Sequence, residues 1–413
     1  MPANDMDKPK TPTAEKRVFA STTYLLSARA LRDFGDGFVA VLLPAYLLVL
    51  GFSPLEVGFV ATAALLGSSL LTITVGFLGA RHDHRHLLLA AASLMVATGV
   101  AFALVHDYAL LLVVAFAGTI NPSGGSVSVF VPLEHAVLAR EVADNIRTKL
   151  FARYSLVGAL AGAVGALLAA VPDLLSPLGV DRLTAIKAMF LFYALIGAAG
   201  GLMYARIPLH RPAPDSAPPT ALGPSRYIVY KLAALFSLDA FAGGFVVQSL
   251  LALWLFERFE MSLAAAGTFF FWSGLFAAFS FPVAAWLSRH IGLVNTMVFT
   301  HIPSSIALIL AAIAPTLPIA IALLLFRAAL SQMDVPTRSS YVMAMVTPQE
   351  RAAAASFTSV PRSLAAASSP ALAGALFAAG LRAWPLVICG GLKIVYDLLL
   401  LIQFRHMKPP EER

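Results

Sequence analysis

The chain has 413 residues, of which 59% are hydrophobic and only 12% are charged. Soluble globular domains carry about 25% charged residues, so this composition excludes an ordinary water-soluble enzyme and indicates a membrane protein. The net charge of +7 indicates orientation in a membrane and contact with anionic lipid, and not nucleic-acid binding. Cys389 is the single cysteine, which excludes a disulfide within the chain.

Uncharged stretches separated by short breaks predict twelve membrane-spanning helices. In chain order they cover residues 22–50, 55–78, 86–105, 109–138, 150–171, 184–205, 227–256, 262–287, 293–314, 317–345, 352–379 and 383–404. Each is long enough, because a helix needs about 20 apolar residues to cross the hydrocarbon core. The predicted fold class is therefore an all-α membrane protein.

The basic residues are distributed unevenly between the two sides of these helices. Of the 29 Lys and Arg residues, 20 are assigned to the side that holds both chain ends and four to the other side, residues inside a span but assigned to a side being included, and the remaining five are assigned to the spans themselves. Cytoplasmic segments of membrane proteins collect Lys and Arg. Both termini are therefore predicted to be cytoplasmic, in an inner (plasma) membrane.

A Pro-rich segment, residues 207–226, lies at the midpoint of the chain. It is predicted to be a cytoplasmic linker between two six-helix bundles, residues 21–206 and 227–405. Residues 1–20 and 406–413 are predicted to be cytoplasmic tails.

Short matches at a nearly constant spacing indicate that the two halves are repeats. Residues 33–39 (DFGDGFV) resemble residues 239–246 (DAFAGGFV), and a similar offset carries Glu134 onto Arg338. A parallel repeat of six spans implies two bundles related by an axis along the membrane normal, with a cavity at their interface.

The loop between the second and third spans carries a signature. Residues 76–85 read GFLGARHDHR, in which Gly76, Gly79, Arg81 and Arg85 fall within a Gly-x-Leu-x-Asp-Arg-x-x-x-Arg pattern. On this pattern the chain resembles the major facilitator superfamily, and a weaker copy (LSRHIG) begins at residue 287. The departure is Ala80, which stands where the family has Asp; Asp83 is the nearby carboxylate that could replace it.

The resemblance implies twelve transmembrane helices in two pseudo-symmetric six-helix bundles that work by alternating access. It does not specify a substrate. The Gly-Pro signature of drug/proton antiporters is absent from the fifth span, and the arginine that the family carries in its fourth span is absent as well. A drug-efflux role therefore has weaker support than the fold.

Four charged residues lie within the first predicted span. Arg29 and Asp33 are four residues apart, as are Arg32 and Asp36, so each pair can close on one helix surface. Ionisable groups within a membrane are costly and mark functional sites. Asp36, the deepest of the four, and Asp33 are therefore predicted to take part in proton coupling, and local neutralisation of the charges is the alternative.

Asp239 in the seventh span is the sharpest candidate for proton coupling. Its neighbours four residues away are Leu235 and Gly243, so no cation on its own helix pairs with it. The alternatives are a structural bond across the two halves and a place already in water. Lys393 and Asp397, four residues apart in the last span, are predicted to pair with each other.

Glu134 and Arg338 occupy matching positions in the fourth and tenth spans. They are predicted to form a reversible gate that closes when the two halves meet, with Asp334 as a second partner for Arg338.

Arg327 lies about halfway along the tenth span. It is predicted to bind substrate, because a guanidinium can hold an anion by forked hydrogen bonds, or alternatively to pair with Asp239 or Asp36. The other side chains expected to contact substrate are Tyr46, Asn121 and Gln248.

The sequence thus predicts a secondary transporter, not an enzyme, that moves a small organic solute with proton coupling, efflux being favoured over uptake. One alternative is uptake or exchange of an organic or inorganic anion held by intramembrane arginine, and another is a membrane sensor or scaffold that does not transport. No nucleotide, metal or organic cofactor is implied. The expected partners are the solute, protons and membrane lipid, and the chain is expected to be a monomer.

Overall fold

The computed structural model describes residues 12–79, 82–124, 128–141, 144–209, 222–347, 350–405 and 407. Within these ranges the chain is helical and contains no strand. Most of the predicted linker and most of the two predicted tails lie outside the described residues.

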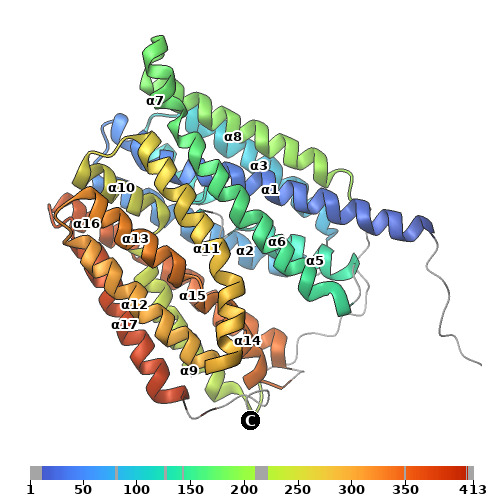
Figure 1. Cartoon of the computed structure of the whole chain (residues 1–413). Helices are drawn as coiled ribbons and strands as arrows, with labels where there is room; N and C mark the ends of the chain where they lie inside the picture. The colour runs from blue at the N-terminus through green and yellow to red at the C-terminus, as the bar shows by residue number, and fades with distance from the viewer. Residues whose placement is uncertain are drawn as a thin grey trace, which may run out of the picture.

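The first half of the chain runs from α1 to α8 (Figure 1). Its helices are α1 (Pro12–Val49), α2 (Pro54–Leu78), α3 (His84–Leu104), α4 (Tyr108–Ala117), α5 (Phe130–Glu141), α6 (Asp144–Leu167), α7 (Val171–Leu175) and α8 (Arg182–Tyr204). Short 3₁₀ turns, Leu168–Ala170 and Ser176–Leu178, flank α7. We call α1–α8 the N half.

The second half runs from α9 to α17 and is called the C half. Its helices are α9 (Arg226–Gly244), α10 (Gln248–Phe259), α11 (Leu263–Ile291), α12 (Leu293–Ala312), α13 (Leu317–Ser331), α14 (Asp334–Met345), α15 (Arg351–Ser368), α16 (Pro370–Ala378) and α17 (Trp384–Phe404).

The helices confirm the twelve predicted spans. Nine described segments are long and apolar enough to cross a membrane. The other three spans are α1, which carries four charges in its middle, α4 with α5, and α15 with α16. The last two are each built from two helices because the helix is interrupted, after Gly118 in one and at Ser369–Pro370 in the other.

The seventh span is also interrupted, between α9 and α10. This interruption contacts that of the fourth span across the two halves. Ser249, at the start of α10, donates its backbone N–H to the carbonyl of Pro122 at 2.9 Å, and the Gln248 amide donates to the carbonyl of Gly37 at 3.5 Å. Non-helical backbone at membrane depth is tolerated only where protein or water satisfies its polar groups. The two interruptions therefore satisfy each other, at a contact that belongs to both halves.

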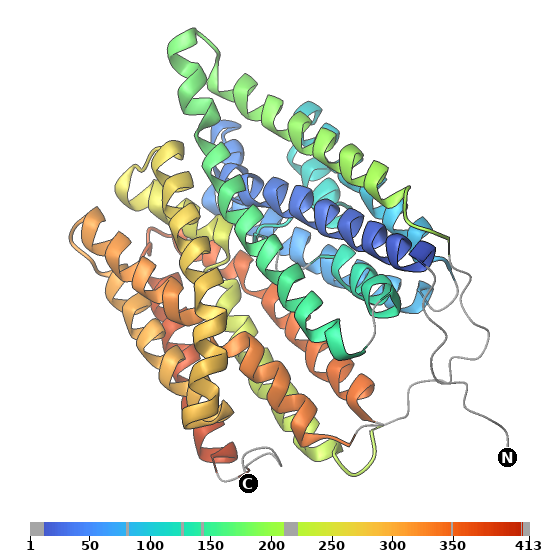
Figure 2. The same ribbon diagram turned by 45° about the vertical axis from the view of Figure 1, so that its right-hand side comes forward.

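The halves lie together at one end of the molecule and diverge at the other (Figures 1 and 2). The diverging end holds the beginning of α1, the end of α8 and the beginning of α9, and we call it the linker end. The helix pairs that join the halves are α1 with α10, α2 with α15 and α16, and α6 with α11.

Opposite the linker end, α2 and α16 approach each other so closely that their contact requires glycine. A Cβ on Gly58 of α2 would lie 2.9 Å from the Cα of Gly374 in α16. Nearby, the Ala371 backbone N–H donates to the Thr62 hydroxyl at 3.0 Å, and the Ala264 N–H donates to the Asp173 carboxylate at 2.9 Å. In this conformation the molecule is therefore closed opposite the linker end.

Candidate functional site

The N half buries a charge network between α1, α5, α6 and α8. Its charged members are Arg29, Arg32, Asp33, Asp36 and Glu134, each 8% exposed or less. Such groups are costly in a membrane interior unless they are paired or hydrated, so their contacts decide what the network can do.

Glu134 is the centre of the N-half network. Arg32 donates from Nη2 to Glu134 Oε2 at 3.1 Å, the Tyr204 hydroxyl donates to Oε1 at 2.5 Å, and the Tyr154 hydroxyl donates to Oε2. The Arg32 guanidinium also lies over the Phe130 ring, 4.7 Å from its centroid. This carboxylate therefore accepts hydrogen bonds from one cation and two phenols.

The predicted pairs on α1 are confirmed in one case and wrong in the other. Arg29 Nη2 lies 2.7 Å from Asp33 Oδ2, as predicted. Arg32 points to Glu134 and lies 3.6 Å from Asp33, and it forms no ion pair with Asp36. Arg32 takes these partners because the fourth span brings a fully buried carboxylate within its reach.

Asp36 has a different environment from the other carboxylates. It is 2% exposed, and it accepts a hydrogen bond from the Tyr193 hydroxyl of α8 at 3.2 Å. Within the described part of the chain, no Lys, Arg or His nitrogen forms an ion pair with it. Asp36 is therefore a buried carboxylate that makes no direct ion pair with a described cation.

The C half buries a second network, which joins α9, α12, α14 and α17. Its charged members are Asp239, His301, Asp334, Arg338, Lys393 and Asp397, and every one of them except Lys393 is 6% exposed or less. Arg338 Nη1 lies 3.1 Å from Asp239 Oδ2 and 2.9 Å from Asp334 Oδ2. The predicted pairing of Arg338 with Asp334 is thus confirmed.

Asp239 pairs with cations from other helices, whereas the prediction considered only the cations of its own helix. Arg338 contacts one of its oxygens, and Lys393 Nζ lies 2.5 Å from the other. His301 Nε2 of α12 is 3.9 Å away. The two cations come from α14 and α17, and the neighbours of Asp239 on its own helix do not reveal them.

Lys393 and Asp397 do not form the predicted pair. Lys393 contacts Asp239, whereas both oxygens of Asp397 lie 3.1 Å from His301 Nδ1. Lys393 Nζ also lies 3.4 Å from His301 Nε2. His301 therefore connects the two carboxylates of the C-half network.

The two networks occupy matching places with reversed charges. In the N half, Arg32 of the first span pairs with Glu134 of the fourth. In the C half, Asp239 of the seventh span pairs with Arg338 of the tenth. The predicted Glu134–Arg338 gate is absent from this conformation, because each residue is bound to a partner within its own half.

The predicted substrate-binding residues have different environments. Tyr46 is fully buried and donates its hydroxyl to the Phe102 carbonyl at 2.5 Å. In this conformation it packs within the N half, and its contact with substrate stays a prediction. Asn121 is 3% exposed and accepts hydrogen bonds from the backbone and hydroxyl of Ser123, which shapes the interruption after α4. Gln248 lies between the halves, as described above.

Arg327 does not pair with Asp239 or Asp36. Its guanidinium makes no hydrogen bond or ion pair with any described residue. Arg362 of α15 likewise has no described ion pair, and its Nε is a buried atom without a hydrogen-bond partner. Neither of these two cations of the C half thus forms an ion pair with a described carboxylate.

The signature loop is described in part. Ala80 and Arg81 lie outside the described residues. Gly76 is near the end of α2 and Gly79 follows that helix, whereas Asp83 caps α3 by accepting from the Arg85 backbone N–H at 2.7 Å.

Three tyrosines are functional candidates that the sequence analysis did not identify. Tyr154 and Tyr204 hold Glu134, and Tyr193 holds Asp36. A tyrosine in an apolar span is weak evidence for a functional role, because burial of its aromatic ring is enough to explain its presence there.

The comparisons with known proteins agree with this architecture. Residues 25–238 match the model of the Major Facilitator Superfamily. An uncharacterised membrane protein of Saccharomyces cerevisiae, YJR124C, is 24% identical over 410 residues, covering 91% of this chain and 92% of that protein.

Solved structures resemble the chain along nearly its whole length. The nucleoside transporter NupG has a TM-score of 0.68 at 16% identity, covering 94% of this chain and 99% of that one. A bacterial homologue of the human lysosomal transporter Spinster, solved in an inward-facing and occupied conformation, has a TM-score of 0.70 at 14% identity. The match covers 95% of this chain and 96% of that one. The human organic anion transporter MFSD10 has a TM-score of 0.62 at 17% identity, and the match covers 95% of this chain and 100% of that one. The chain belongs to the Major Facilitator Superfamily and has the fold of its membrane transporters.

Proposed function

We propose that this protein is a proton-coupled transporter that exports a small organic solute by alternating access, and that Asp36 is the residue that takes up and releases the proton. The observation that carries the proposal is the contrast between Asp36 and the other buried carboxylates. Asp33, Glu134, Asp239 and Asp334 each contact a cation, and Asp397 contacts His301. Among the described residues, Asp36 contacts no cation, and its hydrogen-bond donor is the Tyr193 hydroxyl.

The contrast matters because an ionised carboxylate is costly in a low-dielectric interior unless a cation or several donors compensate it. Protonation removes that cost at Asp36, whereas at Asp239 it would break contacts with Arg338 and Lys393. We therefore assign proton exchange to Asp36, and we assign Asp239, together with Asp33, to the ion-paired framework that holds the helices.

The proposed direction of transport rests on the shape of the molecule and on the distribution of its basic residues. The halves diverge at the linker end (Figure 2). By sequence, the basic residues concentrate on the side predicted to hold the linker and both chain ends. We assign the linker end to the cytoplasm, so a solute for export enters there. Proton entry from the opposite side then drives the return of the empty carrier.

The substrate class is tested first by binding, because the fold occurs in transporters of nucleosides and of organic anions alike. Purified protein is screened by thermal shift against metabolites and drugs at two pH values, and a bound solute raises the melting temperature. A solute found in this way is then followed in proteoliposomes with and without a pH gradient. Binding without transport under every gradient would favour a sensor and contradict the proposal.

A second candidate function is uptake or exchange of an organic anion. The observation in its favour is Arg327, an intramembrane guanidinium that no described carboxylate neutralises. A guanidinium binds a carboxylate or phosphate by paired hydrogen bonds. In the same screen, hits confined to anions and abolished by Arg327→Gln would favour this function, and neutral or cationic hits would count against it.

A further inference from the structure

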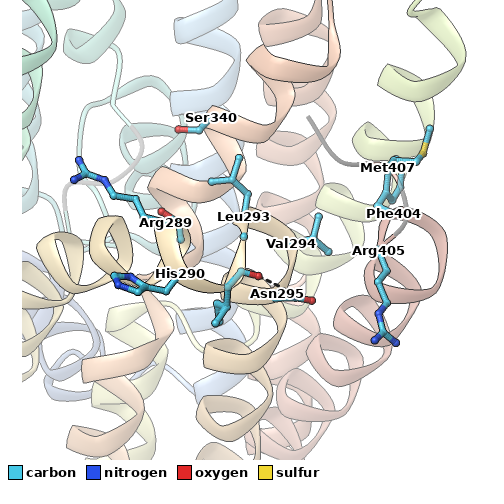
Figure 3. Close-up of a pocket in the computed structure, with 12 residues that line it drawn as sticks. Arg289, His290, Leu293, Val294, Asn295, Ser340, Phe404, Arg405 and Met407 are labelled. Carbon is cyan, nitrogen blue, oxygen red and sulfur yellow. Dashed lines mark hydrogen bonds between the residues drawn. The ribbon is translucent and has the colours of Figure 1, made fainter. Parts of the chain in front are cut away.

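Two cavities of the molecule differ in what their linings can bind. A pocket of about 610 Å³ lies between the α11–α12 junction and the end of α17, but Arg289 and Arg405 lie on opposite sides of it and point apart (Figure 3). They do not converge on one ligand. A much smaller cavity, of about 10 Å³, lies between α1, α3, α5 and α8, and we call it the N-half cavity. Among the described residues that line it, Arg32 and Tyr204 are the two with polar side chains.

Gly200 of α8 gives independent evidence that this space is not filled by protein. It is buried and lines the cavity, yet a Cβ at this position would meet no atom outside its own helix within 4 Å. One turn earlier, a Cβ on Gly197 would lie 3.0 Å from the Met95 side chain. Protein interiors are close-packed, and voids of the size of a water molecule are few. The volume of about 10 Å³ is close to the smallest that holds one water.

The Arg32 guanidinium brings a hydrogen-bond donor to the N-half cavity. Arg32 is 3% exposed, and it donates from Nη2 to Glu134 at 3.1 Å and from Nη1 to the Ser128 hydroxyl at 3.2 Å. Its Nε is buried and donates to no described residue. A buried donor without an acceptor destabilises the folded state, and a charged donor does so most. A ligand that accepts a hydrogen bond is therefore favoured beside Arg32.

The Tyr204 hydroxyl provides the second partner that such a ligand needs. It donates its proton to Glu134 Oε1 at 2.5 Å, so its oxygen remains able to accept. A water molecule can accept from Arg32 Nε and donate to the Tyr204 oxygen. The hydrogen bonds then form a ring that runs from Arg32 through the water and Tyr204 to Glu134, which is already bonded to Arg32 Nη2. Each bond in this ring joins a donor to an acceptor.

We propose that the N-half cavity binds one water molecule, held by Arg32 and Tyr204, and that this water completes the network around Glu134. An apolar occupant would leave Arg32 Nε without an acceptor, and an ion with its own hydration shell is too large for the volume. The bound water supplies the partner that Nε lacks and so fixes the guanidinium on Glu134. This inference does not depend on the transported solute or on the proton site.

The first experiment measures the melting temperature of the purified full chain with Gly200→Ala. The new methyl group takes the place of the water without reproducing its hydrogen bonds, so the melting temperature should fall by at least about 1 °C. Gly391→Ala in α17 is the matched control, because a Cβ there also meets nothing within 4 Å and Gly391 does not line the cavity. Alanine favours a helix over glycine, so this control should melt at the same temperature as the wild type or higher. A rise in Gly200→Ala would show a dry cavity and overturn the proposal.

A second variant distinguishes loss of the water from a steric clash. Tyr204→Phe removes one of the two partners, and a water with a single polar partner is not held. The fall caused by Gly200→Ala should therefore shrink or reverse in a Tyr204→Phe background. A fall of equal size in both backgrounds would show a clash and contradict the site.

An experimental structure of the full chain that orders buried waters tests the site directly. It should show one water within about 2.7–3.2 Å of both Arg32 Nε and the Tyr204 oxygen. Buried waters elsewhere in the N half, with none between these two atoms, would overturn the assignment.

Discussion

Arg338 contacts Asp239 at 3.1 Å, and the pair joins the tenth span to the seventh within one half of the molecule. Arg32 and Glu134 make the matching contact between the first and fourth spans, also at 3.1 Å. Both pairs are internal to a half, so in the proposed transport cycle they would hold each bundle together while the bundles move relative to each other. Rocking of two rigid bundles is the motion that alternating access requires.

Arg32 and Glu134 should be energetically coupled. Removal of one partner from a buried pair costs about 3–5 kcal/mol, because the remaining charge is left uncompensated. We expect losses of this order in the free energy of unfolding for Arg32→Met and for Glu134→Gln, and a smaller loss for the double variant than the sum of the two. Unfolding in mixed detergent micelles measures all three.

The control for this cycle combines Glu134→Gln with Arg338→Met. These residues share no described partner, so their losses should add within about 0.5 kcal/mol. Strong coupling between Glu134 and Arg338 would instead support a direct gate and contradict the internal pairing.

Gly58→Leu should prevent closure opposite the linker end. The new side chain would enter the space of the Gly374 backbone, where even a Cβ lies 2.9 Å from Cα. The measurement uses a Cys389→Ser background that also carries Thr62→Cys. The thiol at position 62 should react faster with a maleimide when Gly58→Leu is present than when Gly58 is kept. Gly76→Leu is the matched control on the same helix, because nothing lies within 4 Å of its Cβ position, and it should leave the rate unchanged.

Glu350 should stabilise the linker end in a pH-dependent way. Hydrogen bonds from the hydroxyls of Thr347 and Ser225, and from the backbone N–H of Gly223, lower the pKa of Glu350 from 4.5 to about 2. A carboxylate whose pKa is lower in the folded state stabilises that state at pH values above its unfolded-state pKa. This stabilisation is lost as the pH falls toward 2.

Glu350→Gln should therefore melt at a lower temperature than the wild type at pH 7. The difference should narrow as the pH falls from about 5 toward the folded pKa. Differential scanning fluorimetry across this range measures it, and a difference that stays constant with pH would contradict the ionised contact.

Tyr193→Phe should change the pH dependence of transport. Its hydroxyl is the described hydrogen-bond donor to Asp36 and favours the ionised carboxylate. Without it, Asp36 should bind its proton more tightly, and the pH of half-maximal transport should rise. Tyr204→Phe is the control, because that hydroxyl contacts Glu134, and it should leave this pH unchanged.

The sequence predicted the spans far better than the contacts between them. Twelve apolar stretches are visible in the composition, and the i,i+4 pairs Arg29–Asp33 and Asp334–Arg338 follow from helix geometry alone. The partners of Asp239 lie 99 and 154 residues further along the chain. Which faces of α9, α14 and α17 meet depends on helix rotation, which an apolar sequence with a weak periodicity does not specify.

The interrupted fourth span shows a different kind of error. The segment 109–138 was predicted as one helix because residues 108–133 are uncharged. Gly118 and Pro122 were visible as helix-breaking residues, but their effect depends on backbone partners from α10, which no local pattern reveals.

The most direct test of the account is proton-driven transport by Asp36→Asn in proteoliposomes. The amide mimics the protonated carboxylate, so this variant should still exchange solute across the membrane but should no longer accumulate it when a pH gradient is imposed. Asp33→Asn serves as the neighbouring control, because Asp33 is paired with Arg29 and its loss should impair folding or rate without abolishing the response to the gradient. If Asp36→Asn accumulates solute with the same dependence on the gradient as the wild type, Asp36 is not the coupling residue.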